Sequence, residues 1–418
     1  GEILTYVYEQ TTYPEWLFSA YRTGTSPMGP LPSGAGDLAQ GCESCHMPSA
    51  GPNGHPTVSK IASIQEHSNF PQAENALGAE EIDLPEREGF AEHELAGLNV
   101  FLIKMAQQFP DIFGIPTLDP MLVSKGQPSL MYTEQAMLDQ ADNDVAKINV
   151  SGAKVTEGVL EATVSIENLV GHKLPSGVGF RRAFVEFQVL DRLGNSLWAS
   201  GSTNSAGVIV DNHGQPIDGE LWWKDDCSGL VSPGNPEFQP HYQTVTASNQ
   251  AQIYQELVTS PADVPNPQCG PNPVPGGNLT TSFLSICGDV KDNRLLPHGF
   301  LPLEKRTELA RAIGADERLA EEAGAHFVDA DPDYENGGGD SLAYRIPLSD
   351  IPGEPVSVQA TLHSQSIPPF YLQDRFCTAE GNDRDRLYFL AGHLNLNGTE
   401  AQDWRFELVS SGPVSVVR

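Results

Sequence analysis

Residues 156–169 read Thr-Glu-Gly-Val-Leu-Glu-Ala-Thr-Val-Ser-Ile-Glu-Asn-Leu, and apolar and polar side chains alternate along most of this stretch. A period of two puts alternate side chains on opposite faces of an extended chain, which is typical of a half-buried β-strand. The alternation recurs over Arg182-Ala-Phe-Val-Glu-Phe-Gln-Val-Leu-Asp191, and Leu193-Gly-Asn-Ser196 predicts a turn into a hairpin partner at 197–200. This part of the chain therefore predicts antiparallel β structure.

The rest of the C-terminal two thirds follows the same plan. Further strands are predicted at about 251–258, 342–348, 356–363 and 404–417, with a helix at about 303–323 between them. The Pro- and Gly-rich segments 203–250 and 259–278 are predicted as long surface loops. Short strands separated by such loops are typical of an antiparallel β-sandwich.

The first third has a different pattern, with helical pieces separated by irregular chain. A short helix is predicted at 13–22, an irregular stretch at 24–89, and a helix within 91–109 that Pro110 ends. A further helix is predicted at about 129–147, with an apolar side made by Met131, Ala136, Met137 and Val145. We therefore expect an α+β protein, with a helical and irregular domain over 1–147 and a β-sandwich-like domain over 148–418.

The irregular stretch contains Gly41-Cys-Glu-Ser-Cys-His-Met-Pro48. Cys42-x-x-Cys45-His46 is the attachment motif of a c-type haem: each thiol adds to one vinyl group, and the adjacent imidazole binds the iron as proximal ligand. The alternatives are half of a zinc site or a redox-active cysteine pair. Zinc requires a second ligand pair at suitable spacing, and a redox pair usually opens a helix after a buried strand. The sequence has neither context, and we predict haem c.

A haem c iron takes a second axial ligand or keeps an open site. Met47 follows the proximal histidine directly and cannot reach the opposite face of the ring. His93, at the start of the helical pattern, and His172, in a loop at a strand end, are the candidates. The alternative for each is an ordinary hydrogen-bonded histidine.

Several blocks of the chain, taken together and in order, resemble multihaem c-type cytochromes, which are exported electron carriers of anaerobic and metal-reducing bacteria. The blocks are Glu9-Gln-Thr-Thr-Tyr-Pro-Glu-Trp16, Cys42 to Pro48, His93-Glu-Leu-Ala-Gly-Leu-Asn99, Gly171-His-Lys-Leu-Pro-Ser-Gly177 with Arg181-Arg-Ala-Phe184, and the segments 291–300, 337–344 and 366–372. The resemblance covers nearly the whole chain.

This resemblance implies that His93 and His172 are distal haem ligands. The chain differs from that family in the number of attachment motifs. Relatives usually carry a further Cys-x-x-Cys-His upstream, and this chain has one such motif. One iron with a proximal ligand has room for one more histidine. We therefore expect His93 to bind the local iron and His172 to reach a haem outside these residues, in a chain that is the C-terminal part of a longer or processed cytochrome.

Charge and hydropathy limit the partners. The formal net charge is −31, from 24 basic and 55 acidic residues, which argues against nucleic acid and anionic membrane surfaces as partners. A run of about 18 apolar residues is absent from the sequence, which predicts no membrane span. Because haem c is attached outside the bacterial cytoplasm, we expect a periplasmic or extracellular protein whose signal was removed before Gly1.

The other cysteines form an even set, Cys227, Cys269, Cys287 and Cys377. Two disulfides in an oxidising compartment are predicted, with Cys269–Cys287 the first pairing to expect across a Pro- and Gly-rich loop. The alternative is four small buried side chains.

Two further features, an acidic loop and a pair of tryptophans, bear on ligand binding. Asp329, Asp331, Asp333 and Asp340, with Glu335, crowd a Gly-rich loop and make it a weak Ca²⁺ candidate. The spacing is not that of an EF-hand, and a solvated acidic loop is the alternative. Trp222-Trp223 fits core packing better than a stacking platform for a ligand.

The sequence therefore favours an electron carrier over an enzyme, with other haem groups, cytochrome subunits and redox donor or acceptor proteins as partners. The first alternative is a haem enzyme for peroxide or nitrogen-oxide chemistry at an open iron face. The second is a structural subunit of an extracellular cytochrome assembly. Motifs of hydrolases and kinases are absent from the sequence.

Overall fold

The computed structural model describes residues 8, 10–24, 40–50, 55–60, 86–91, 97–115, 123–124, 127–260, 277–328 and 330–417. The chain forms two compact units. Unit 1 comprises 1–39, 144–388 and 396–418, and unit 2 comprises 40–143 and 389–395. The predicted boundary at 147 lies next to the junction at 143–144, whereas residues 1–39 group with the β-rich unit. The predicted α+β class is confirmed.

One sheet of unit 1 grows from the stretch with the clearest alternation. Its strands are β5 (Ala146–Thr156), β6 (Val159–Asn168), β11 (Thr244–Val245) and β15 (Gly339–Pro347), in the order β11-β15-β6-β5. β6 pairs antiparallel with β5 and β15, and β11 pairs parallel with β15. Leu160, Ala162, Val164 and Ile166 are buried on one face of β6, as a period of two requires.

The second sheet of unit 1 has the strand order β13-β12-β7-β16-β17, with β14 beside β12, β18 beside β16 and β8 beside β7. The strands are β7 (Arg182–Leu190), β8 (Ser196–Ser200), β12 (Ile253–Ser260), β13 (Asn278–Thr280), β14 (Gly288–Asp292), β16 (Ser357–Gln365), β17 (Phe406–Ser410) and β18 (Val414–Ser415). The described pairings of this sheet are antiparallel.

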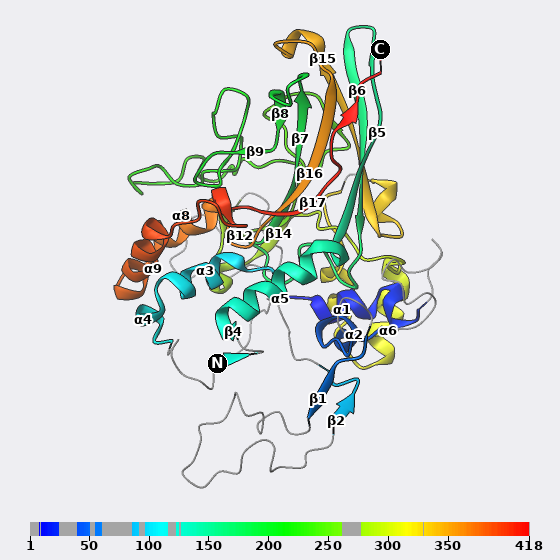
Figure 1. Ribbon diagram of the computed structural model, residues 1–418, viewed down its shortest axis with the longest axis vertical. Coiled ribbons are helices and arrows are strands. Elements are labelled where there is room, and N and C mark those ends of the chain that lie inside the picture. Colours follow the sequence, from blue (N-terminus) through cyan, green and yellow to red (C-terminus); the bar gives the residue numbers. More distant parts are fainter. Residues whose placement is uncertain are drawn as a thin grey trace. The chain divides into compact units, whose positions relative to one another are not determined.

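The two sheets pack face to face within unit 1 (Figure 1). Phe187 of β7 stacks on Tyr344 of β15 with ring centroids 4.0 Å apart, and both side chains are fully buried. β7 is buried almost throughout, because Phe184 on its other face packs against Ile209, Ile217 and Ile253. The segment 203–250, predicted as a surface loop, therefore covers a sheet, and it contributes β9 (Ser202–Thr203) and β10 (Ile209–Val210).

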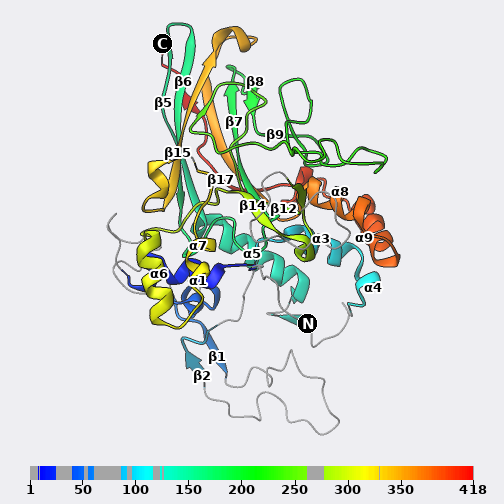
Figure 2. The ribbon, with the colours of Figure 1, turned by 180° about the vertical axis from the view of Figure 1, so that it is seen from behind.

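The helices of unit 1 are shorter than the sequence pattern predicts. The stretch 13–22 forms α1 (Thr12–Leu17) and the 3₁₀ turn η1 (Ala20–Arg22). The predicted helix 303–323 is two helices, α6 (Leu303–Ala312) and α7 (Arg318–Glu322), seen in yellow in Figure 2. Gly314 has φ +73° between them, a left-handed conformation that ends a helix and that glycine adopts without a Cβ clash.

The remaining helical elements of unit 1 lie towards the C-terminus or in short turns. They are α8 (Pro369–Thr378), α9 (Asn382–His393), whose last residues belong to unit 2, and the 3₁₀ turns η4 (Phe283–Ser285), η5 (Pro332–Tyr334), η6 (Leu348–Asp350) and η7 (Gln402–Trp404).

Unit 2 is mainly helical. Its described elements are α2 (Cys42–His46), β1 (Val58–Lys60) paired with β2 (Glu86–Glu88), α3 (Val100–Gln108), α4 (Pro110–Phe113), β3 (Val123–Ser124) paired with β4 (Gln127–Pro128), and α5 (Ser129–Asp144). Asn99 caps α3 through its side chain, which accepts from the Leu102 amide. Ala136 and Met137 of α5 are buried as predicted, whereas Met131 is 55% exposed, so its predicted place on the apolar side is wrong.

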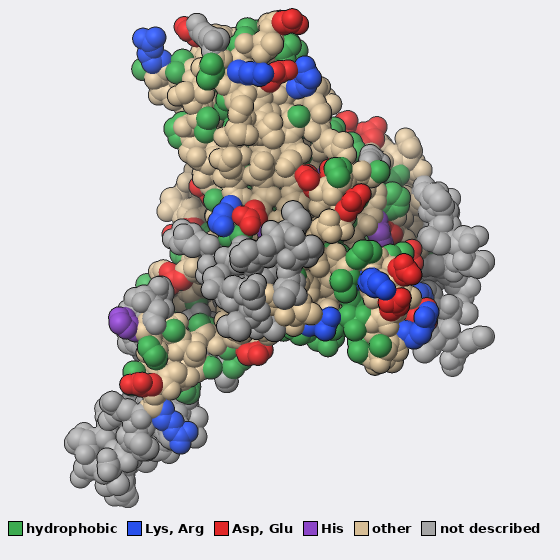
Figure 3. Space-filling model, turned by 90° about the vertical axis from the view of Figure 1, so that its right-hand side faces the viewer, with side chains coloured by type: hydrophobic (Ala, Val, Ile, Leu, Met, Phe, Trp, Pro, Cys, Tyr) green, Lys and Arg blue, Asp and Glu red, His purple; other side chains and the backbone are tan. Residues whose placement is uncertain are grey.

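In the part of the chain that the structure describes, no helix is both long and apolar enough to cross a bilayer. Acidic and basic side chains are interspersed on the face shown in Figure 3, rather than gathered into a patch of one sign.

Candidate functional site

Cys42, Cys45 and His46 lie on one helical turn in unit 2. They form the first, fourth and fifth residues of α2, a spacing that places all three on one side of a helix. Both cysteines are exposed and neither forms a disulfide. Two accessible thiols beside an imidazole on one face are the set of groups that covalent haem attachment requires, so the local geometry fits the group that the motif predicts.

His46 is half-buried, and its ring faces the side chain of Gln140 on α5. Gln140 Nε2 lies 3.4 Å from His46 Nδ1. A hydrogen bond at one ring nitrogen determines which form the other nitrogen takes. The contact therefore orients the ring, with Nδ1 towards Gln140 and Nε2 on the side away from Gln140.

His172 lies in unit 1, in the loop after β6. Its Nδ1 lies 2.9 Å from the backbone oxygen of Lys173. Because a carbonyl oxygen can only accept a hydrogen bond, Nδ1 carries a proton. A histidine that binds iron through Nε2 likewise carries a proton on Nδ1.

The loop around His172 is anchored on both sides. Asn168 Nδ2 donates to the His172 carbonyl at 2.9 Å and to the Leu295 carbonyl at 3.0 Å. The Lys173 amide donates to the fully buried carboxylate of Glu15 at 3.0 Å. A Cβ on Gly171 would lie 3.2 Å from the Tyr21 ring, so the backbone passes close to η1.

Two of the sequence blocks, 171–177 and 291–300, meet in a buried polar network within unit 1. Lys173 Nζ donates to Asp292 Oδ2 at 2.7 Å, and Arg294 donates to both oxygens of Asp292, at 2.8 and 2.7 Å. Burial alone would raise the pKa of Asp292, but Arg294 and Lys173 outweigh it and hold that pKa well below its usual range. The sequence blocks at 171–177 and 291–300 are therefore joined by buried ion pairs.

A second buried ion pair lies on β7. Arg182 donates to both carboxylate oxygens of Glu220, at 2.5 and 2.9 Å, and to Gln365 Oε1 at 2.7 Å. Arg182 and Glu220 are each 1% exposed. The pair holds the segment 203–250 against the sheet.

The predicted calcium ligands differ in how deeply the structure buries them. Asp331 and Asp340 are buried with His241, Asp333 is half-buried, and Asp329 lies outside the described residues. Asp331 Oδ2 lies 3.0 Å from His241 Nε2, and Asp340 Oδ2 accepts from Tyr254 Oη at 2.7 Å. Burial, opposed by His241 and Tyr254, raises the pKa of Asp340 to about 6. The calcium prediction remains untested.

Two side-chain amides determine the tautomer of His241. Gln252 Nε2 and Asn293 Nδ2 lie 2.9 and 3.2 Å from His241 Nδ1. Their oxygens accept from backbone N–H groups of Tyr242 and Gln255, so neither amide can turn over without losing a hydrogen bond. Nδ1 is therefore an acceptor and Nε2 carries the proton, which argues against a metal ion on Nε2.

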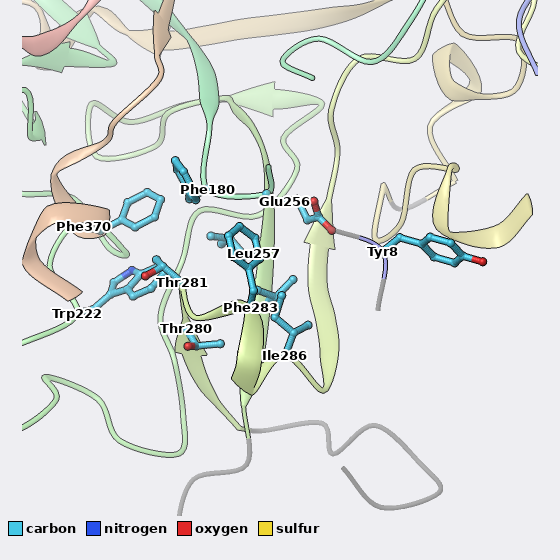
Figure 4. Close-up of a pocket in the computed structure, with 12 residues that line it drawn as sticks. Tyr8, Phe180, Trp222, Glu256, Leu257, Thr280, Thr281, Phe283, Ile286 and Phe370 are labelled. Atoms are coloured by element: carbon cyan, nitrogen blue, oxygen red, sulfur yellow. The ribbon is translucent and has the colours of Figure 1, made fainter. Parts of the chain in front are cut away.

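An aromatic pocket with little water-accessible space lies in unit 1 (Figure 4). Phe180, Trp222 and Phe370 line it together with Glu256, whose pKa burial raises against the opposing effect of Arg294. Its free volume is about 30 Å³, room for about one water molecule. Trp222 stacks on Phe370 with ring centroids 4.5 Å apart, which confirms core packing for this tryptophan.

The cysteines outside the attachment motif agree with an oxidised protein. Cys227 and Cys377 form a disulfide, and Cys287 is disulfide-bonded. Cys269, its predicted partner, lies outside the described residues, and so does His93.

Gln140 is the residue of the candidate site that sequence reasoning missed. Its signal was a polar residue among the apolar positions of a helix.

Comparisons with known proteins add one structural likeness. No family model and no curated protein matches the chain. A solved structure of a penta-haem cytochrome c552 from Thermochromatium tepidum is similar at 13% identity and a TM-score of 0.31, over 89% of this chain and 55% of that one. The chain thus spans about half the length of that cytochrome. A TM-score of this size is too low to transfer a fold or a function.

Proposed function

We propose that this chain binds a haem covalently through Cys42 and Cys45, with His46 as proximal ligand, and that it is an electron carrier. The observation that carries the proposal is the single helical turn that presents both exposed thiols and the imidazole on one side. When bound, the haem supplies a centre for one-electron transfer. The chain's part is to attach it, to ligate it and to set its surroundings.

The test is covalent attachment in the full chain, produced in a host that matures c-type cytochromes. We expect a haem absorbance that stays with the denatured polypeptide, and its loss in Cys42→Ser/Cys45→Ser. The matched control is Cys227→Ser/Cys377→Ser, which removes two cysteines elsewhere and keeps the absorbance. A wild-type chain that carries no covalent haem contradicts the proposal.

The state of the iron separates an electron carrier from a haem enzyme. With His93 as distal ligand, the iron would be held by two imidazoles, and we expect a low-spin spectrum. Axial methionine raises the potential of haem c relative to histidine, so we expect a midpoint potential below zero. A high-spin ferric spectrum would instead favour the enzyme with an open iron face, and a sulfur-to-iron charge-transfer band would show a methionine ligand.

We also propose that His172 binds the iron of another haem. Its Nδ1 donates to a backbone carbonyl and its loop is anchored by Asn168 and Glu15, so the imidazole is oriented in the iron-binding form before any ligand arrives.

A further inference from the structure

α5 places the half-buried Gln140 beside its buried apolar positions. Ala136, Met137 and Ala141 are each less than 10% exposed, and Ala136 and Met137 pack with Ile103. Gln140 is four residues after Ala136 and three after Met137, which puts it on the same side of the helix. A polar group on such a side is stable when it has a hydrogen-bond partner there.

The partner of Gln140 is the imidazole of His46. The distance of 3.4 Å from Nε2 to Nδ1 is at the long end of the hydrogen-bond range. The oxygen and nitrogen of a side-chain amide have nearly the same shape, so turning the amide over presents Oε1 at the same place. Gln140 can therefore donate to a bare Nδ1 or accept from an Nδ1–H.

An iron bound at Nε2 would favour one of these two arrangements. A neutral imidazole that binds a metal through Nε2 carries its proton on Nδ1, and an acceptor for that proton orients the ring and makes the ligand more basic. A more basic axial ligand stabilises ferric over ferrous iron and lowers the potential. The residue next to Nδ1 is thus placed to adjust the redox centre without touching it.

We infer that Gln140 is a positioning residue: its amide oxygen accepts from His46 Nδ1–H when the haem is bound, and it sets the donor strength of the axial imidazole and so the midpoint potential. This inference rests on the proposed haem at Cys42, Cys45 and His46. A stronger hydrogen-bond acceptor at residue 140 lowers the midpoint potential, and loss of that acceptor raises it.

Gln135 supplies a matched control on the same helix. It lies five residues earlier on a different side of α5, is exposed, and donates to Asp139 Oδ1 at 2.7 Å. Gln135→Glu adds the same charge to the same helix as Gln140→Glu, and Gln135→Leu removes the same amide.

The experiment measures midpoint potentials and ferric EPR g values of the haem-loaded full chain for all four variants. We expect Gln140→Glu to lower the potential more than Gln135→Glu does and to change the g values, because a carboxylate accepts more strongly than an amide. We expect Gln140→Leu to raise the potential, while Gln135→Leu leaves it at the wild-type value.

The possible results are distinguishable. Equal shifts in Gln140→Glu and Gln135→Glu, with unchanged g values, would mean that only added charge acts, and this would overturn the inference. If Gln140→Leu does not fold, the two glutamate variants still decide. A wild-type chain without covalent haem refutes the proposed function itself and is recognised before any potential is measured.

Discussion

Arg182 is a fully charged side chain with almost no water around it. Its guanidinium donates to Glu220 and Gln365, and it lies 5.4 Å from the centre of the Phe370 ring. A buried charge of this kind is tolerated when its counter-charge is present. The pair is therefore more sensitive to the loss of one partner than to the loss of both.

We predict that Glu220→Gln lowers the free energy of unfolding by about 3–5 kcal/mol, because it leaves the buried Arg182 without a counter-ion. The double variant Arg182→Met/Glu220→Gln should lose less than the sum of the two single changes. Urea unfolding at fixed pH measures all three. The exposed pair of Arg311 and Glu317 is the control, and Arg311→Ala should leave the unfolding midpoint unchanged. Additive losses at 182 and 220 would contradict the expected coupling.

Asp340 makes stability depend on pH. Burial raises its pKa from the ordinary 3.8 to about 6, so the folded state holds this proton more tightly than the unfolded state. Its contribution is complete below about pH 4 and is lost as pH rises towards 6, by about 3 kcal/mol in total. Asp340→Asn should flatten the stability profile between pH 4 and 7 relative to wild type, as urea midpoints at several pH values will show. An identical slope in both proteins is the contrary result.

At the scale of the element, sequence periodicity predicts strands better than it predicts helix ends. β6 and β7 lie where alternation or β-rich composition put them. β5 was missed because the helix predicted to 147 ran over its first residues, although Ile148 and Val150 already show the period of two. α5 ends at Asp144 instead.

The missed helices have a physical reason as well. α9 is rich in charged residues, and Leu390 is its buried residue among those described, so it has little apolar periodicity to detect. α8 begins at Pro369, where a proline fits the first turn but is easily taken for a loop. The contact of His46 with Gln140 spans 94 residues, and no local pattern predicts such a distance in sequence.

The disulfide of Cys227 and Cys377 joins the segment 203–250 to α8 across 150 residues. Closing a loop of this size is worth about 5 kcal/mol in the chain-entropy model, and measured values are usually smaller. We predict that Cys227→Ser/Cys377→Ser lowers the unfolding midpoint in urea, with little change in the far-ultraviolet spectrum. Thiol counting on the denatured, unreduced wild type should find neither cysteine reactive. Two reactive thiols at these positions would contradict the bond.

At the scale of the whole molecule, the chain has more candidate iron ligands than its single haem-attachment motif requires. Unit 1 has no Cys-x-x-Cys-His in its sequence, yet it holds the proposed ligand His172 with Nδ1 hydrogen-bonded to a backbone carbonyl. We predict that the native assembly contains more haem than this chain attaches, as haem absorbance per polypeptide and native mass will show.

His172→Met should then change the spectrum and raise the potential of a haem other than the one at His46. The control is His213→Met at an exposed histidine, which should change neither. Equal haem and attachment motifs in the native material would contradict this prediction.

α1 and η1 depend on residues that are made much later. Glu15 accepts from the Lys173 amide, 158 residues further on, and the Ala20 amide donates to the His298 carbonyl. During synthesis, these contacts therefore form only after the chain as far as His298 has emerged. Cys42 and Cys45 emerge within that interval, so both thiols are accessible in an open chain before unit 1 has closed.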